Sequence, residues 1–193
     1  MSESTEQPQS LGQLFRDGEA IRKSLEASYD SNTAAFQENL ASAITTYEEC
    51  IRIADRISLF SPNETLDDIS SSDLQYLLLH YYVAELVLRI MGNGRKSNLE
   101  RAQTNYIKFL KLLDNYDILS QADSKLYERY LEDPESFSTA SKTDAAARRE
   151  TKIARFREEK ELKAKLEVRK AHARIDSNRL LTILSILDKI LQP

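Results

Sequence analysis

The chain has 193 residues, of which 41% are hydrophobic and 30% are charged, and its formal net charge is −4. This length suits one sizeable hydrophobic core, and the single cysteine, Cys50, excludes an internal disulfide bond. The acidic, Ser-rich residues 1–10 lack the basic and then apolar layout of a signal peptide, so we expect a cytoplasmic location, with the nucleus as the alternative.

Composition predicts a nearly all-α protein. Only four Gly and four Pro are present, and Leu, Ala, Glu, Lys and Arg, which favour helices, are abundant. We expect residues 1–10 to be a disordered N-terminus and residues 11–133 to form a core of packed helices.

The first part of this core contains two apolar stripes with helical spacing. The first runs from Leu11 to Tyr29, where the polar cluster Asp30–Asn32 interrupts it. The second runs from Phe36 to Ile57 and stops at Ser61–Asn63, because the residue before a proline disfavours helical dihedral angles. We therefore expect two helices, the second about six turns long.

The most apolar stretch, Leu74–Met91, contains His80, Glu85 and Arg89, so we interpret it as a core helix and not as a membrane span. Ser72 or Asp73 is the expected cap at its start.

Gly92 and Gly94 are the expected left-handed stops after that helix. The spacing of Ser97–Glu100 is that of a capping box and predicts the start of a fourth helix, with apolar positions from Ala102 to Leu113. Leu126–Leu131 indicates a short fifth helix that ends before Asp133 and Pro134. Short connections make an antiparallel helical array the expected architecture, and alanine–tyrosine spacings in two of the helices resemble those of tetratricopeptide hairpins.

The last third of the chain differs from the core. Residues 134–142 predict a flexible link, and residues 143–170 a long basic helix capped by Thr143 or Asp144. Residues 171–193 are expected to include an apolar helix at 179–191, which has to pack on the bundle, on another copy of the chain or on a missing continuation of it.

Residues 148–174 are basic in an otherwise acidic chain, since they carry eleven Lys or Arg and five Glu, a net charge of +6, while the rest has a net charge of −10. At 100° per residue, five of their side chains fall in a sector of about 80°. These candidate partner-binding residues are Arg149, Lys152, Phe156, Lys160 and Lys163. Cationic side chains beside an aromatic ring can form charge-assisted hydrogen bonds with acidic groups on a partner protein.

Other interpretations of this helix remain open. Spacings such as Glu159 to Lys163 and Glu161 to Lys165 are also typical of a solvated helix with internal salt bridges. Nucleic-acid binding is disfavoured because the whole chain is acidic and the helix has no set of base-stacking side chains. Membrane-surface binding is disfavoured because the helix lacks a wide apolar face.

No constellation for catalysis or metal binding is present in the sequence. His80, His172 and Cys50 are far apart and have no metal-ligand spacing, so we expect structural roles for them. There is no glycine-rich phosphate loop and no nucleophile elbow. We expect no cofactor, no bound metal and no enzymatic activity.

Two ordered blocks of sequence resemble a known family. Leu59–Ile69 (LFSPNETLDDI) with Ser72–Leu78 (SDLQYLL), and then Arg149–Leu162 (RETKIARFREEKEL), are similar to the alpha-four/TAP family of regulatory proteins, which bind catalytic subunits of type 2A protein phosphatases. The resemblance covers residues 11–166 and implies a helical array like tetratricopeptide or 14-3-3 folds. Residues 171–193 depart from the family pattern.

The resemblance also implies where the partner binds. Arg149 and Lys152 match the family's pair of basic residues that contact the phosphatase, Phe156 its aromatic position and Lys160 its basic position before Glu-Leu. The implied function is a non-catalytic regulator that stabilises or sequesters the catalytic subunit in target-of-rapamycin signalling. The alternative hypothesis is a helical scaffold that self-associates through residues 179–191 and binds another acidic protein.

Overall fold

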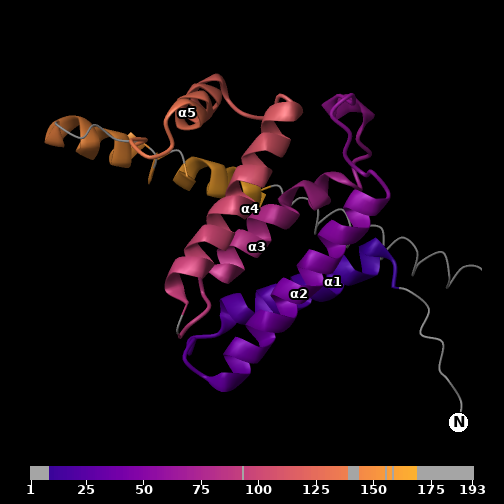
Figure 1. Cartoon of the computed structure of the whole chain (residues 1–193). Helices are drawn as coiled ribbons and strands as arrows, with labels where there is room; N and C mark the ends of the chain where they lie inside the picture. The colour runs from indigo at the N-terminus through magenta and orange to yellow at the C-terminus, as the bar shows by residue number, and fades with distance from the viewer. Residues whose placement is uncertain (1–8, 93, 139–143, 155, 158, 169–193) are drawn as a thin grey trace, which may run out of the picture. The chain divides into compact units, whose positions relative to one another are not determined.

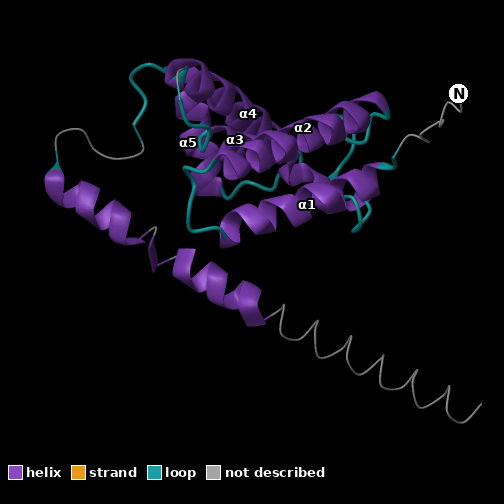
Figure 2. Ribbon diagram, turned by 90° about the horizontal axis from the view of Figure 1, so that it is seen from below, coloured by secondary structure: helices purple, strands orange, loops and turns teal. Residues whose placement is uncertain are grey.

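The computed structural model describes residues 9–92, 94–138, 144–154, 156–157 and 159–168. Every regular element within these ranges is a helix (Figures 1 and 2), which confirms the prediction of an all-α protein. The chain divides into two compact units, Met1–Glu132 and Asp133–Pro193.

The first hairpin consists of α1 (Leu11–Ala27) and α2 (Ala34–Arg56), which lie side by side. Ser10 and Thr33 cap the two helices, because each side-chain oxygen accepts a hydrogen bond from a first-turn amide. Both predicted helices are therefore confirmed. Tyr29 is a correction: it lies beyond the end of α1 and its side chain is fully exposed, so it does not extend the apolar stripe.

The apolar stretch after the first hairpin begins differently from the prediction. Leu74–Leu78 form the short 3₁₀ helix η2, and α3 starts only at Leu79 and ends at Val87. Asp73 makes no side-chain cap, since its carboxylate accepts a 2.8 Å hydrogen bond from the Ser70 hydroxyl. This local bonding competes with helix capping, and the α-helix predicted from Leu74 is therefore wrong in its first turn.

The start of α4 (Arg95–Asn115) is a second correction. The predicted capping box at Ser97 does not form, because the helix begins before this residue with Gly94 as its N-cap. Gly92 and Gly94 have φ of +104° and +107°, which confirms the predicted left-handed conformations. The positive φ of Gly94 directly precedes α4, so the helix starts at Arg95 and Ser97 is left inside it.

The final helix of the first unit, α5 (Gln121–Glu132), ends before Asp133 as predicted. The Ser120 hydroxyl accepts from the amide of Asp123 at 3.2 Å and so caps its start. In Figure 1, α5 lies beside the C-terminal end of α4. The Ser124 hydroxyl donates to Asp114 at the end of α4, and Tyr127 is buried.

The core lies where α2 and α3 pack together and where each packs on its hairpin partner. Ala43, Tyr47, Val83 and Val87 are completely buried in it. Cys50 is also buried as a free thiol, and burial raises its pKa to about 11. This fits the structural role that the sequence predicts for Cys50.

A hydrogen-bonded group at the edge of the core holds α1 to α2 and α3. The Glu19 carboxylate accepts from the Tyr47 hydroxyl at 2.7 Å and from Arg22 Nε at 2.8 Å. The Arg22 guanidinium lies over the ring of Tyr82, 4.6 Å from its centroid. One carboxylate therefore satisfies a buried tyrosine hydroxyl and positions a cation–π contact.

The second unit is helical at residues 145–154, 156–157 and 159–168. The Asp144 carboxylate accepts from the amides of Ala146 at 2.8 Å and Ala147 at 3.1 Å, so Asp144 is the N-cap. The sequence predicted either Thr143 or Asp144 for this role. Residues 1–8, 93, 139–143, 155, 158 and 169–193 lie outside the described residues. One continuous basic helix over 143–170 stays a prediction, and the apolar helix at 179–191 lies in the range that is not described.

Candidate partner-binding surface

The five candidate partner-binding residues are all exposed in the second unit. Each lies in a helical stretch, and 66% of the Phe156 surface is accessible. A large aromatic side chain with this exposure, between cations, is typical of a contact site for another molecule. The candidates are Arg149, Lys152, Phe156, Lys160 and Lys163.

The two salt bridges that the alternative interpretation requires are present. Lys163 pairs with Glu159, and Lys165 Nζ lies 2.8 Å from Glu161 Oε1. The hydrogen bond from Lys165 lowers the pKa of Glu161. Exposed pairs of this kind contribute little stability, because solvent and salt screen the attraction between the charges. These salt bridges stabilise the helix only weakly, so their charged groups can still bind a partner.

Arg149, Lys152 and Lys160 differ from these paired lysines. Within the described ranges of the second unit, none of the three forms a salt bridge. An arginine has five N–H donors in a planar fork and a lysine has three donors. These three side chains can therefore accept a carboxylate-bearing partner without first breaking an ion pair of their own.

Apolar side chains are also exposed in these stretches. Ile153 is 40% exposed, Leu162 58% and Leu166 51%. At helical spacing Leu162 and Leu166 lie on a different side from Phe156. The predicted absence of a single apolar stripe therefore agrees with the exposure pattern, and Phe156 is the large apolar side chain within the cationic sector.

In the described part of the chain, no group of three or more potential metal-ligating side chains comes together. Among the same residues, no helix is both long and apolar enough to cross a bilayer. The exposed side chains described within residues 145–154, 156–157 and 159–168 can form charge-assisted hydrogen bonds and apolar contacts.

The first unit contains a cavity of about 540 Å³ that no sequence pattern predicted. It is lined by residues of the α1–α2 connection, the segment after α3 and the first residue of α4, including Arg89 and Arg95. The segments that line the cavity are far apart in sequence and share no motif. The fold brings them together, because the loops of the two hairpins lie next to each other.

The first unit thus defines an antiparallel helical array, and the second an exposed, cation-rich helical segment. The chain belongs to the TAP42-like family, which it matches over residues 11–180. This match contains both sequence blocks that resemble the alpha-four/TAP family and extends beyond Leu166. The resemblance is confirmed.

Curated relatives agree with this assignment. The chain is 28% identical over 166 residues to a protein of Nicotiana tabacum named PP2A regulatory subunit TAP46, an alignment that covers 86% of this chain and 37% of that protein. It is 31% identical over 135 residues to the Type 2A phosphatase-associated protein 42 of Saccharomyces cerevisiae, covering 59% of this chain and 36% of that protein. The chain therefore spans less than half the length of these relatives.

A solved structure supports the fold. The structure described as the Tap42 Alpha4 subunit superposes with a TM-score of 0.65 at 27% sequence identity, and the alignment covers 82% of this chain and 75% of that chain. The similarity covers most of the chain and supports its helical architecture.

Proposed function

We propose that this chain is a non-catalytic regulator that binds the catalytic subunit of a type 2A-like protein phosphatase. The observation that carries the proposal is its membership of the TAP42-like family, together with relatives whose names describe type 2A phosphatase regulatory or associated proteins. The first unit supplies a rigid helical platform, and the second unit supplies the binding side chains.

The proposed contact uses the cationic sector of the second unit. Arg149 and Lys152 are exposed and form no salt bridge within the described residues, so they are placed to engage acidic groups of the catalytic subunit. Phe156 adds an apolar contact in the middle of the sector, and Lys160 and Lys163 extend the charged part. Lys163 pairs weakly with Glu159, so an acidic group of the partner can replace this contact.

Binding through this sector has two possible consequences for the phosphatase, which are stabilisation of the catalytic subunit or its sequestration from other subunits. The resemblance to the family favours such a role in target-of-rapamycin signalling. The rate of thermal inactivation of the catalytic subunit, measured with and without the chain, separates the two consequences. Slower inactivation supports stabilisation, and loss of assembly with other subunits at an unchanged rate supports sequestration.

The experiment that tests the function is calorimetric titration of the purified catalytic subunit, with a pull-down as a second readout. We expect binding by the wild-type chain and at least roughly hundredfold weaker binding by the Arg149→Glu, Lys152→Glu variant, because it loses two charged hydrogen bonds worth about 1.5–3 kcal/mol each. The matched control is the Lys111→Glu, Lys125→Glu variant, which makes the same change in charge at exposed positions of the first unit.

The control variant should bind like the wild type. Equal weakening of both double variants would assign the effect to net charge and remove the site proposal. No binding by a folded wild-type chain would remove the function.

Self-association through residues 179–191 is a separate proposal. Light scattering over a range of concentrations tests it, with a variant that ends at residue 178 as the comparison. A dimer that both chains form equally would contradict it.

A further inference from the structure

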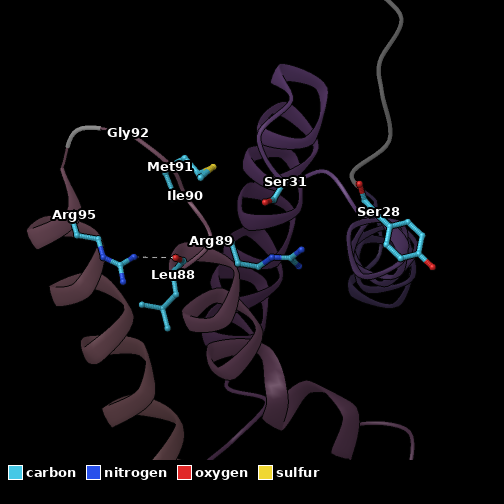
Figure 3. A pocket seen from close by; sticks show the side chains of 9 residues that line it. Ser28, Ser31, Leu88, Arg89, Ile90, Met91, Gly92 and Arg95 are labelled. Carbon is cyan, nitrogen blue, oxygen red and sulfur yellow. Dashed lines mark hydrogen bonds between the residues drawn. The ribbon is translucent and has the colours of Figure 1, made fainter.

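The cavity of the first unit lies where the loops of its two hairpins meet. Ser28 and Ser31 come from the connection between α1 and α2, and Arg89 and Met91 follow α3 (Figure 3). Arg95, the first residue of α4, completes this part of the lining. The volume of about 540 Å³ falls in the range of protein sites that bind ligands.

Hydrogen bonds hold the two loops together around the cavity. The Gln37 side chain accepts from the Met91 amide at 3.2 Å and donates to the Ser31 carbonyl at 3.1 Å, so one residue of α2 bridges both loops. Arg89 donates to the Leu25 carbonyl at 3.1 Å, and its guanidinium lies over the ring of Phe36. The cavity is therefore formed in advance, which lowers the entropic cost of binding.

The charge of the lining is one-sided. Among the described residues that line the cavity, Arg89 and Arg95 are the charged ones, and Asp and Glu are absent. The nearby Asp30 is not part of the lining, and its carboxylate accepts from the Asn32 amide. In a chain with a net charge of −4, two arginines in a lining whose described residues include no carboxylate favour the binding of an anion.

Both guanidinium groups keep donors for a ligand. Arg95 Nη1 donates to the Leu88 carbonyl at 3.3 Å, the bond drawn in Figure 3, and Arg89 uses Nη2 for Leu25. Each arginine has five N–H donors, so these contacts position the groups without exhausting them. An arginine fixed in this way binds a carboxylate at a smaller entropic cost than a freely rotating one.

Apolar side chains surround the cations. Leu88 and Ile90 are half-buried in the wall, Met91 is 54% exposed, and the ring of Tyr29 is fully exposed. A small inorganic anion would leave this apolar wall unused. A peptide segment that carries carboxylates next to aliphatic side chains would use both the wall and the arginines.

We propose that this cavity binds a short acidic peptide segment of a partner protein, with one carboxylate at Arg95 and a second at Arg89, and with aliphatic side chains that pack on Met91 and Tyr29. This surface is additional to the cationic sector of the second unit. It lies entirely in the first unit and does not depend on binding of the phosphatase.

The test uses the full chain, labelled with ¹⁵N, and titration with the acetylated pentapeptide Glu-Leu-Glu-Leu-Glu, followed by amide chemical shifts and calorimetry. We expect shift changes at residues 28–31 and 88–92. The Arg95→Glu variant should bind about tenfold more weakly, as expected for loss of one charged hydrogen bond. The matched control is Lys96→Glu, the next residue of α4, which is outside the lining and should change the affinity less than about twofold.

Several outcomes would overturn the proposal. These are equal weakening by Lys96→Glu, equal binding of the peptide Lys-Leu-Lys-Leu-Lys, or shift changes elsewhere in the chain. If inorganic phosphate binds with equal affinity and shifts the same amides, the ligand of the cavity is a small anion and not a peptide. Circular dichroism checks the fold of the Arg95→Glu variant. Met91→Glu, which places a negative charge in the apolar wall, gives a second test with the same expected loss, and both variants should still bind the phosphatase.

Discussion

Ser61 and Tyr116 form a reciprocal pair of hydrogen bonds across 55 positions of the chain. The Tyr116 hydroxyl accepts from the Ser61 amide at 3.0 Å and donates to the Ser61 carbonyl at 3.1 Å. Tyr116 is buried, and its ring meets Phe60 edge to face with centroids 6.1 Å apart. This contact fastens the block Leu59–Ile69, which resembles the family pattern, to the end of α4.

Tyr116→Phe should therefore weaken the first unit while keeping the ring contact. We expect the free energy of unfolding to fall by about 1–2 kcal/mol, because two backbone groups of Ser61 lose their partner. Urea unfolding followed by circular dichroism measures the change. Tyr29→Phe is the control, since that side chain is fully exposed and its substitution should have no effect. A similar loss in both variants would contradict this role of Tyr116.

Gly18 in α1 lies against the side chain of Tyr47, and a Cβ atom at this glycine would meet Tyr47 Cε1 at 3.1 Å. Tyr47 is completely buried and bonded to Glu19, so it has no room to move. We expect Gly18→Ala to lower the free energy of unfolding by about 1 kcal/mol, since crowding of about 1–3 kcal/mol exceeds the gain in helix propensity of about 1 kcal/mol.

The matched control for this crowding is Gly12→Ala in the same helix. Its Cβ would lie at an ordinary contact distance of 3.4 Å from the Tyr76 hydroxyl. We expect this variant to be as stable as the wild type or more stable by up to about 1 kcal/mol. Thermal unfolding of both variants separates the two expectations, and a stabilised Gly18→Ala variant would disprove the crowding argument.

Glu19 should make stability depend on pH in the acid range. Burial opposes its ionisation, but hydrogen bonds from Arg22 and Tyr47 outweigh this effect and lower its pKa below the ordinary value of 4.5. A lowered folded-state pKa stabilises the fold above the unfolded-state value, and this contribution is lost as the pH falls through the lowered pKa.

The comparison is between the wild type and Glu19→Gln. The wild type should be more stable at pH 7, and the difference should shrink below pH 4.5 and vanish at still lower pH. Urea unfolding at a series of pH values measures this difference. A difference that is constant across the series would show that the charge of Glu19 does not contribute.

Lys163 and Lys165 form a matched pair for the proposed phosphatase contact. Both side chains are bonded to a glutamate four residues before them, and they are 73% and 66% exposed. At 100° per residue, Lys163 lies in the cationic sector and Lys165 on the opposite side. We expect Lys163→Glu to weaken binding of the catalytic subunit by about fivefold and Lys165→Glu to leave it unchanged.

Calorimetry with the purified catalytic subunit checks this expectation. Each variant loses one exposed salt bridge of small energy, so helix stability should change equally in both. Equal binding losses would indicate general electrostatic attraction and not a defined face. Unchanged binding in both variants would remove Lys163 from the site.

Local sequence predicted much of the fold because amphipathic periodicity is a local property. The spacing from Leu11 and from Phe36 identified α1 and α2, and the apolar positions before Asp133 identified α5. The predicted start of α4 was wrong because two cap signals compete there, and the left-handed Gly94 precedes Ser97. The cationic sector was also readable from spacing, and its role in phosphatase binding stays a prediction.

The sequence by itself determined the all-α class, the helix faces that become buried and the family to which the chain belongs, because composition, periodicity and ordered motifs are written along the chain. Only the tertiary structure decided which distant residues meet. It paired Ser61 with Tyr116, placed Glu19 between Arg22 and Tyr47, and joined two loops through Gln37 into a cavity with two arginines. Such contacts depend on how whole helices pack, and no local pattern encodes them.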